Sequence, residues 1–482
     1  MKNEASHLVS GGSAPSFSRV GAGALKRMAV WTLGLIGFIV SAGAENLGYT
    51  LALFTAFWLA MLATENRSRN FLHPLVAFPL FYYPYSTWYS YSALLQGTED
   101  LHLLYLSVHY AFAGLLVFYV AGMALLPGRR EKNRAPRIRF ADVQIGEKAV
   151  IGVCLLAIAF SFHRVLEGGF ISKRELSDSA SSLVAAAGFA FWLLTAVVLL
   201  ALVRRRHART KLGRLWFVVV AFFVLEYLLA GQRDYLFRLL ICAAFLYFDH
   251  RRMAGLPVLL TVLFVVSLLL PLTQMFKAMV IAESLGPWNS ELGALFLSEF
   301  SSASKNLYVL IQHGFEPSWS FVWSDIVRGL VPFGEVYGFQ STGAWFHWIY
   351  RPDEGIGGTS GWGFGLVAQG VLVGGLPGIA LVMGSVAVIL ALLYKRRMRS
   401  EYWYVFYLLA LSTSLYCIRA DLANLLSQTF KVGGLCVLGL YAIRRYSAFL
   451  GGGMSAPRPA AAEKAADPAP LGRPPREKAG AR

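Results

Sequence analysis

Residues 101–126 read LHLLYLSVHYAFAGLLVFYVAGMALL, a run without a single Asp, Glu, Lys or Arg. An α-helix rises 1.5 Å per residue, so about 20 apolar residues cross the hydrocarbon core of a bilayer. The run stops shortly before Arg129 and Arg130. It therefore predicts a membrane-spanning helix with a basic segment at its end.

The composition of the whole chain extends this prediction. Of the 482 residues, 56% are hydrophobic and only 15% are charged, against about 25% charged residues in soluble domains. We expect an all-α, polytopic integral membrane protein with about twelve transmembrane helices. The apolar runs that predict these helices are 28–44, 47–63, 73–92, 101–126, 149–163, 183–203, 215–230, 235–248, 256–273, 363–394, 403–418 and 424–443.

The basic residues give an orientation. With the N-terminus inside and alternating spans, 33 of the 44 Lys and Arg fall in the inner segments. Basic residues are retained on the cytoplasmic side of membranes, so both termini are expected there. The same rule explains the net charge of +17, and no nucleic acid is expected as a partner.

This orientation divides the chain into five parts. They are an inner segment 1–27, nine spans in 28–273, an outer loop 274–362, three spans in 363–443 and an inner tail 444–482. The tail is rich in Gly, Pro, Ala and charge from residue 451, which predicts disorder. The run 363–394 is long enough for one tilted helix or for a re-entrant piece followed by a helix.

The outer loop is unusually long and aromatic. Loops of this length are uncommon unless they carry function, and this one holds six of the twelve Trp. Their rings suit an interfacial belt or the stacking of sugars. Residues 291–308 show helical spacing of apolar side chains, which fits a helix on the outer leaflet or one packed on the bundle.

Eleven basic residues remain on the outer side against the general rule. Four of them, Arg233, Arg238, Arg419 and Lys431, lie where a charge within a span costs about 2.5–3.5 kcal/mol. An anionic ligand on the outer face would account for several at once. The alternative is a set of internal ion pairs, Arg233 with Asp234, Arg419 with Asp421, and Arg351 with Asp353 or Glu354.

Residues 355–378, GIGGTSGWGFGLVAQGVLVGGLPG, contain ten glycines. Glycine permits close approach of two backbones and allows helix breaks where a cavity is lined. Small-residue packing of helices would need only a few of them.

Several short motifs resemble one family of bacterial membrane enzymes. The turn Gly231-Gln232-Arg233-Asp234 resembles the G-x-R turn of Wzy-type O-antigen polymerases, the oligosaccharide repeat-unit polymerases. A large loop then ends in Gly358-Thr359-Ser360-Gly361-Trp362-Gly363-Phe364, followed by Gly370 and Gly374-Gly375. Arg419 precedes the last span, as in that family. The resemblance covers roughly 215–445.

The resemblance implies a GT-C-like glycosyltransferase of the bacterial inner membrane that acts at the periplasmic face. Its donor would be a glycan on undecaprenyl pyrophosphate and its acceptor a repeat unit on the same carrier, in O-antigen, capsule or exopolysaccharide synthesis. Membrane lipid and a chain-length regulator protein are the other implied partners. No cofactor and no metal ion are expected.

The residues assigned to this activity lie on the outer side. We predict a catalytic role for Arg233, Arg351 and Arg419, which would hold the pyrophosphate. A general base must take the proton of the acceptor, and the candidates are Glu299, Asp325, Glu335, His347, Asp353 and Glu354, of which Glu335 and Asp353 are predicted as catalytic. Predicted substrate-binding residues are Arg328, Arg238, Lys305, Trp345, His347 and Trp348.

Three other functions compete with the polymerase. O-antigen ligases share the overall plan but usually carry a His-Asn pair where this chain has Thr359 and Ser360. A transporter or flippase of a lipid-linked sugar would favour internal repeats, and none is evident. A purely structural scaffold would not explain the outer arginines.

The orientation makes a direct prediction for reporter fusions. Fusions after Arg130, Arg206, Arg252 and Arg397 should report the cytoplasm, because each follows a basic inner segment. A fusion at Gly314 should report the periplasm. A cytoplasmic signal at Gly314 would overturn the assignment of spans.

Overall fold

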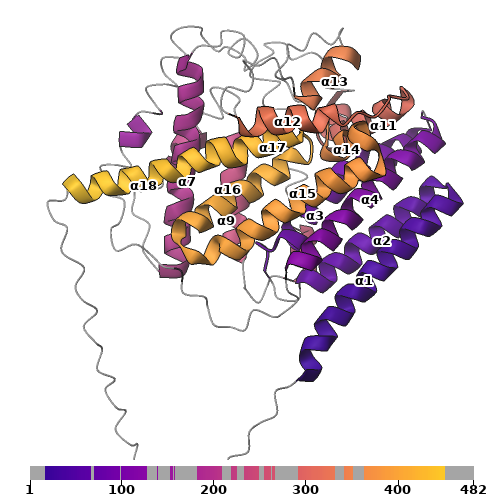
Figure 1. The fold of residues 1–482 in the computed structure, drawn as a ribbon, viewed down its shortest axis with the longest axis horizontal. Coiled ribbons are helices and arrows are strands. Elements are labelled where there is room, and N and C mark those ends of the chain that lie inside the picture. Colours follow the sequence, from indigo (N-terminus) through magenta and orange to yellow (C-terminus); the bar gives the residue numbers. More distant parts are fainter. Residues whose placement is uncertain are drawn as a thin grey trace, which may run out of the picture.

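Every element is a helix in the part of the chain that the computed structural model describes. Figure 1 shows these helices as one bundle. The described residues are 17–66, 70–97, 99–126, 182–208, 219–224, 233–248, 255–261, 263–265, 291–331, 341–350 and 363–450, together with 138, 152–155 and 157.

The first four helices form two hairpins at one side of the bundle (Figure 1). The second hairpin is sharply bounded: Gly97 ends one helix in the left-handed conformation, and the Asp100 side chain accepts from the backbone N–H of His102 to start the next. Such caps satisfy backbone groups that have no partner within a helix. The four helices are α1 (Phe17–Ala44), α2 (Leu47–Glu65), α3 (Pro74–Gln96) and α4 (Leu101–Leu125).

The middle of the chain adds two long helices and three shorter ones. Residues 291–308, predicted as an amphipathic helix, lie in α11, and the structure packs it on the bundle: the Phe300 ring lies 4.8 Å from that of Tyr85 on α3. The outer loop of the sequence prediction is thus largely helical where it is described. These elements are α7 (Ser182–Ala208), α9 (Arg233–Phe248), α11 (Glu291–Gln312), α12 (Ser320–Leu330) and α13 (Thr342–Tyr350).

The last part of the chain contains two helix interruptions. The long apolar run at 363–394 is a short helix followed by a long one, separated at Gly375 with φ 64°, which decides between the two predicted forms. A second interruption is a π-helix at Ser427–Val432. The helices here are α14 (Leu366–Gly374), α15 (Leu376–Arg396), α16 (Glu401–Cys417), α17 (Leu422–Leu426) and α18 (Gly433–Leu450).

Membrane-spanning character is clear for part of the bundle. Among the described residues, five helical stretches are long and apolar enough to cross a bilayer: Gly23–Ala44, Leu47–Glu65, Leu101–Leu125, Leu376–Arg399 and Leu422–Tyr446. Helices α3, α7, α9 and α16 coincide with four further predicted spans. The predicted spans 149–163 and 215–230 lie mostly outside the described residues, and half of 256–273 does too, so the number twelve stays a prediction.

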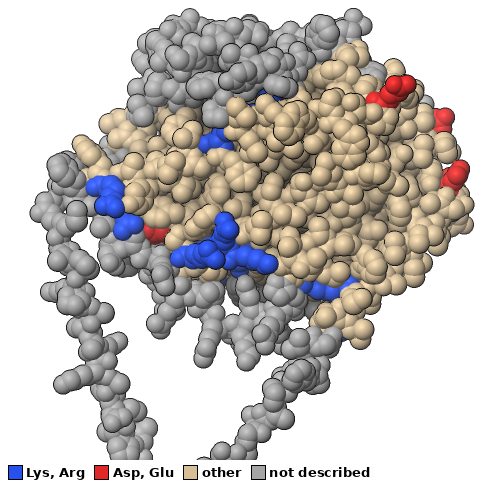
Figure 2. All heavy atoms as spheres, in the orientation of Figure 1, with Lys and Arg blue, Asp and Glu red and all other residues tan. Residues whose placement is uncertain are grey.

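Charged residues are segregated on the surface. In Figure 2 most of the visible Lys and Arg lie at the left and along the lower part of the molecule, and most of the visible Asp and Glu lie at its right and upper right. The helix ends agree with this, since α7 and α15 both finish with basic residues, whereas Glu45, Glu99 and Asp100 occupy the turns α1–α2 and α3–α4. The two sides of the bundle therefore differ in charge, as expected for a membrane protein.

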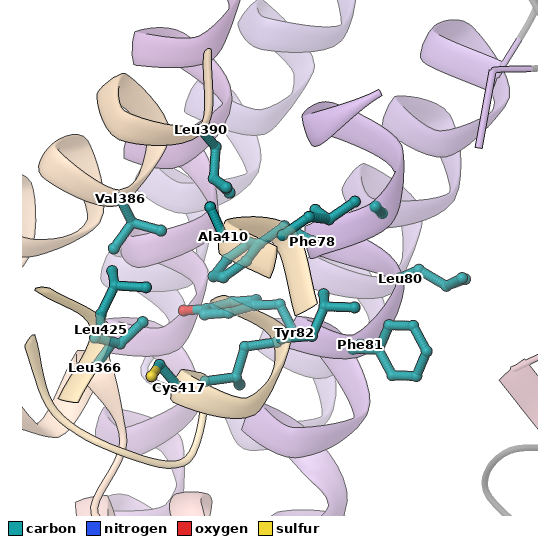
Figure 3. Packing of buried hydrophobic residues seen from close by; sticks show 14 of the residues in the cluster. Phe78, Leu80, Phe81, Tyr82, Leu366, Val386, Leu390, Ala410, Cys417 and Leu425 are labelled. Atoms are coloured by element: carbon teal, nitrogen blue, oxygen red, sulfur yellow. The ribbon is translucent and has the colours of Figure 1, made fainter. Parts of the chain in front are cut away.

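The core lies where α3 meets the C-terminal helices. Figure 3 shows Phe78 and Tyr82 of α3 among Leu366, Val386 and side chains of α16 and α17. The Tyr82 hydroxyl donates to the Ala111 carbonyl at 2.8 Å, so its polar end is satisfied inside an apolar cluster. This core supports the turn after α16, where the candidate site lies.

Glycine allows α14 and α15 to pack backbone to backbone. A Cβ on Gly378 would lie 2.1 Å from the carbonyl oxygen of Gly370, and one on Gly370 would lie 2.6 Å from the Cα of Ile379. Both contacts involve backbone, which cannot rotate away. The prediction of close backbone approach in the glycine-rich stretch is confirmed at these two positions.

A matched pair of substitutions on α15 tests this packing. Gly378→Ala should destabilise the purified protein by about 1–3 kcal/mol, because the added methyl group forces the helices apart. Gly384→Ala on the same helix should be neutral or slightly stabilising, since its nearest heavy atom outside the helix is 3.9 Å away. Thermal unfolding in detergent gives both values, and equal effects would contradict the close approach.

Candidate functional site

The candidate site surrounds the turn between α16 and α17. Helix α16 ends at Cys417, and the chain turns through residues 418–421 before α17 and the π-helix. A π-helix is rare and is frequently found at functional sites. Here it brings Gln428 toward α9 and Lys431 toward α12.

Arg238 of α9 is buried beside this turn, with only 6% of the residue exposed. Its guanidinium donates to Thr413 Oγ1 at 2.9 Å and to Gln428 Oε1 at 2.7 Å. It also lies over the rings of Trp192 and Tyr416, at 4.7 and 4.8 Å from their centroids. Its Nε has no hydrogen-bond partner. Among the described residues, no carboxylate pairs with Arg238, so its charge is buried against neutral groups.

Arg27, which is buried, and Arg204, which is largely buried, are two arginines of this bundle that carboxylates compensate. Arg27 forms an ion pair with Glu65 and donates to the Leu126 carbonyl at 2.6 Å. Arg204 binds Glu401 through two hydrogen bonds of 2.7 and 2.8 Å. Breaking such a pair leaves an uncompensated buried charge, which costs several kcal/mol. Among the described residues, Arg238 has no such carboxylate partner.

Arg419 approaches the same ring as Arg238. Its guanidinium carbon lies 5.3 Å from the centroid of Tyr416, and the residue is half-buried. The glycine-rich stretch passes directly beside it: a Cβ on Gly363, which has φ 77°, would meet Ser302 Oγ at 2.4 Å and the Arg419 Cβ at 3.4 Å. The structure therefore brings Arg238 and Arg419, two of the outer arginines that the sequence singles out, to one aromatic ring.

Asp421 does not neutralise Arg419. Its Oδ1 accepts from the backbone N–H and the side-chain amide of Asn424, at 2.8 and 2.7 Å, and its Oδ2 accepts from the Gly343 N–H at 3.2 Å. The carboxylate thus caps α17 and holds the first turn of α13. Within the described residues there is no ion pair between Arg419 and Asp421, so this one pairing of the structural alternative is not formed.

A closed ring of buried hydrogen bonds supports the site from the other side. Asp325 of α12 accepts from the backbone N–H of Thr342 at 3.0 Å, from its hydroxyl at 2.7 Å, and from the Gln369 amide. The Gln369 oxygen in turn accepts from the Leu422 N–H at 2.7 Å. Asp421, which precedes Leu422, accepts from the Gly343 N–H of α13, and this bond closes the ring. Four helices, α12, α13, α14 and α17, are joined in this way.

Burial raises the pKa of the Asp325 carboxyl well above its usual value, and the nearby Asp421 acts in the same direction. Hydrogen bonds from Thr342 and the charge of Arg328 oppose that rise. Asp325 is fully buried and accepts from three donors. Asp325 stays one of the candidate general bases predicted from the sequence. In the structure its carboxylate joins α12 to α13 and α14 through these hydrogen bonds.

Two further basic residues lie between α12 and the π-helix. Arg328 occupies the last turn of α12 and is half-buried. The Lys431 amino group donates to the Arg328 carbonyl at 2.6 Å. A Cβ on Gly329 would lie 2.7 Å from the Leu426 Cβ, so α12 packs tightly on α17. Both cations are therefore fixed beside the turn that carries Arg419.

The remaining predicted substrate-binding residues differ in their surroundings. Trp345 packs against the rings of Phe315 and Phe321, at 4.9 and 4.7 Å, which is an aromatic cluster within the 291–350 region. Lys305 is exposed on α11. Trp319 and Trp323 of the α12 region are 57% and 64% exposed, so these two rings fit an interfacial belt.

The other predicted site residues are not placed as side chains. Arg233 is the first residue of α9, a little more than one turn before Arg238, and His347 and Trp348 belong to α13. The side chains of these three lie outside the described residues. Four more, Glu335, Arg351, Asp353 and Glu354, lie outside the described residues entirely.

Sequence reasoning missed Thr413, Tyr416, Gln428 and Gln369. Each is a polar residue inside or beside an apolar run, which is itself a signal, because polar groups at membrane depth are costly and are usually bonded to one another. The sequence could not say which of them meet, since Gln428 and Arg238 are 190 positions apart.

Comparisons of the chain with protein-family models, with curated proteins and with solved structures find no match in any of the three. The site is therefore interpreted from its own geometry.

A pair of substitutions tests the direction of hydrogen bonds in the ring. Asp325→Asn places an amide N–H₂ against the Gln369 amide or the Thr342 hydroxyl, and should destabilise the protein by about 1–3 kcal/mol through an unsatisfied buried donor. Gln369→Glu should also destabilise, because two carboxylates would then face each other. The double variant should recover much of the loss, since the introduced carboxylate accepts from both the introduced amide and the Leu422 N–H.

Thermal unfolding of the four proteins gives the comparison. Additive losses in the double variant would contradict the ring, because independent sites add and coupled sites do not.

Proposed function

We propose that this chain is a multi-pass glycosyltransferase of the bacterial inner membrane. It polymerises oligosaccharide repeat units carried on undecaprenyl pyrophosphate, at the periplasmic face. The observation that supports it most is the buried charge of Arg238, which has neutral partners and lies beside a second arginine, Arg419.

An anionic ligand would supply the counter-charge that Arg238 does not have among the described residues. The guanidinium stays charged in proteins and offers donors in a planar fork that matches phosphate oxygens. Its Nε remains without a hydrogen-bond partner. Arg419 adds a second guanidinium at the same ring, and Arg328 and Lys431 lie next along α12 and the π-helix. Several cations around one turn suit a ligand with more than one negative charge.

The proposed reaction uses this charge on the leaving group. An acceptor hydroxyl attacks the anomeric carbon of the donor glycan, the bond from that carbon to the pyrophosphate oxygen breaks, and undecaprenyl pyrophosphate leaves. Cationic donors placed where charge develops stabilise such a transition state. The acceptor proton passes to a general base, for which Glu335 and Asp353 stay the candidates.

The orientation is supported by the segregation of charge. The basic ends of α7 and α15 mark the cytoplasmic side, and the acidic turns α1–α2 and α3–α4 mark the other. If α9 spans the membrane between these two sides, its first residue, Arg233, lies on the side of the acidic turns. Arg238 and Arg419 then lie toward the periplasm, in agreement with the twelve-span arrangement.

A transporter of a lipid-linked anion is the second candidate. The break between α14 and α15 at Gly375 and the π-helix before α18 are interruptions of the kind that line substrate sites in transporters. A transporter would use the same arginines to bind, without a base and without a change in glycan length. The experiment below separates the two.

Conservative substitutions of the two arginines test the role of the guanidinium. Arg238→Lys and Arg419→Lys keep the charge but lose the planar fork. Each should lower the rate of glycan polymerisation about a hundredfold or more, equivalent to roughly 3 kcal/mol of lost transition-state stabilisation. The measurement is the length distribution of surface glycan in a deletion strain that expresses each variant.

Arg445→Lys is the matched control, because Arg445 is exposed and bonds only the Tyr441 hydroxyl among its described contacts. Membrane abundance is followed by blot. Glycans limited to a single repeat in the two site variants, with normal length in the control, support the polymerase. Full-length polymer in both site variants would refute it, and loss of all periplasmic repeat units would indicate the transporter.

A further inference from the structure

An apolar groove runs between α16 and α18. It has a volume of about 770 Å³, within the range of about 300–1,000 Å³ that is typical of ligand sites. Aromatic side chains form much of its wall, and two of them, Phe406 and Phe430, pack edge to face with their ring centroids 6.3 Å apart. The residues used below are Leu330, Tyr402, Phe406, Phe430, Lys431 and Gly434.

The two ends of the groove differ. One end reaches Ser400 and Tyr402 at the start of α16, where the Tyr402 hydroxyl accepts from Arg444 at 3.4 Å. The other end reaches Lys431 of the π-helix and Leu330 of α12. This second end adjoins the candidate site, because the same π-helix carries Gln428, which bonds Arg238. A ligand in the groove would thus have its Lys431 end next to the arginines.

The length of the groove fits one leaflet of a bilayer. Its lining on the C-terminal side extends from Phe430 to Tyr441, which spans about 16 Å at the helical rise, close to half of a hydrocarbon core of about 30 Å. An apolar chain anchored by an anionic head at Lys431 matches both the length and the charge.

We propose that this groove holds the isoprenoid chain of a polyprenyl diphosphate, with its head group at Lys431 and directed toward Arg238 and Arg419. The inference rests on the proposed function and adds where the carrier lies in this chain. In this arrangement the π-helix has two roles. Gln428 orients Arg238, and Phe430 and Lys431 contact the carrier in the groove.

Filling the groove tests the position of the chain. Gly434 lines the groove, and a Cβ there would have no atom within 4 Å. Gly434→Leu therefore occupies the groove without a clash in the fold, and Gly434→Ala occupies less of it. Gly43→Leu is the matched control, because Gly43 lies in α1, away from the groove, and is equally open.

Binding is measured on the purified full chain with farnesyl diphosphate and with inorganic pyrophosphate as probes. Gly434→Leu should weaken farnesyl diphosphate binding about tenfold or more and Gly434→Ala less, whereas both should bind pyrophosphate as the parent protein does. Lys431→Gln should weaken both probes. Arg444→Gln, at the other end of the groove, and Gly43→Leu should weaken neither.

Three results would overturn the proposal. Unchanged farnesyl diphosphate binding in both Gly434 variants would place the chain elsewhere, while leaving the polymerase proposal intact if Arg238→Lys still limits the glycan to one repeat. Binding of phosphatidylglycerol that is lost in Arg444→Gln, with no effect of Lys431→Gln, would make the occupant a phospholipid of the inner leaflet. A dimer that Gly434→Leu disrupts would make it a second copy of the chain.

Discussion

A positive charge cannot be removed from water without a free-energy cost, and Arg238 is buried with no carboxylate partner among the residues that the structure describes. Its described neighbours are a hydroxyl, an amide oxygen and two aromatic rings. These groups orient the guanidinium and reduce the free-energy cost of its burial, but they do not neutralise its charge. Arg27 and Arg204 show that the same bundle supplies carboxylates where an arginine serves the fold. The cost at Arg238 is the kind that proteins retain at functional sites.

The surrounding structure is arranged to keep that residue and Arg419 in place. Carboxylates close to the turn are used elsewhere: Asp421 caps one helix and holds another, and Asp325 accepts three hydrogen bonds deep in the ring. Glycines bring the 363–365 segment against Arg419 and bring α14 against α15. Each of these contacts needs its particular residue type, because an acceptor-only group or a missing Cβ decides the geometry.

Much of the helical framework follows from hydropathy. The sequence predicts the runs that became α1, α2, α4 and α15, and it predicts the helix at 291–308, because long periodic segments carry strong signals. The sequence predicts a loop where the structure has the short helices α12 and α13. These helices have only eleven and nine residues, and polar groups interrupt their apolar faces, so neither helix stands out within a long aromatic segment.

The site was predictable in kind but not in detail. The positive-inside rule identifies Arg238 and Arg419 as exceptions, because each is a basic residue on the outer side where a charge within a span has a free-energy cost. The ring of Tyr416 between them and the bond to Gln428 depend on a π-helix and on contacts between distant segments. Neither leaves a periodic signal. The alternative pairing of Arg419 with Asp421 is not formed, because proximity in sequence does not show that the carboxylate already binds the first turns of α17 and α13.

The central claim is that the charge of Arg238 is kept for a ligand and not for the fold. Replacement by methionine removes the charge and keeps an unbranched side chain of similar reach, and apolar replacement of buried charges is often neutral or stabilising. The direct measurement is the thermal unfolding midpoint of purified, ligand-free Arg238→Met beside that of the parent protein. The account predicts a variant at least as stable as the parent that makes no polymer. A variant that unfolds at a much lower temperature would show that Arg238 is a structural residue and would contradict the account.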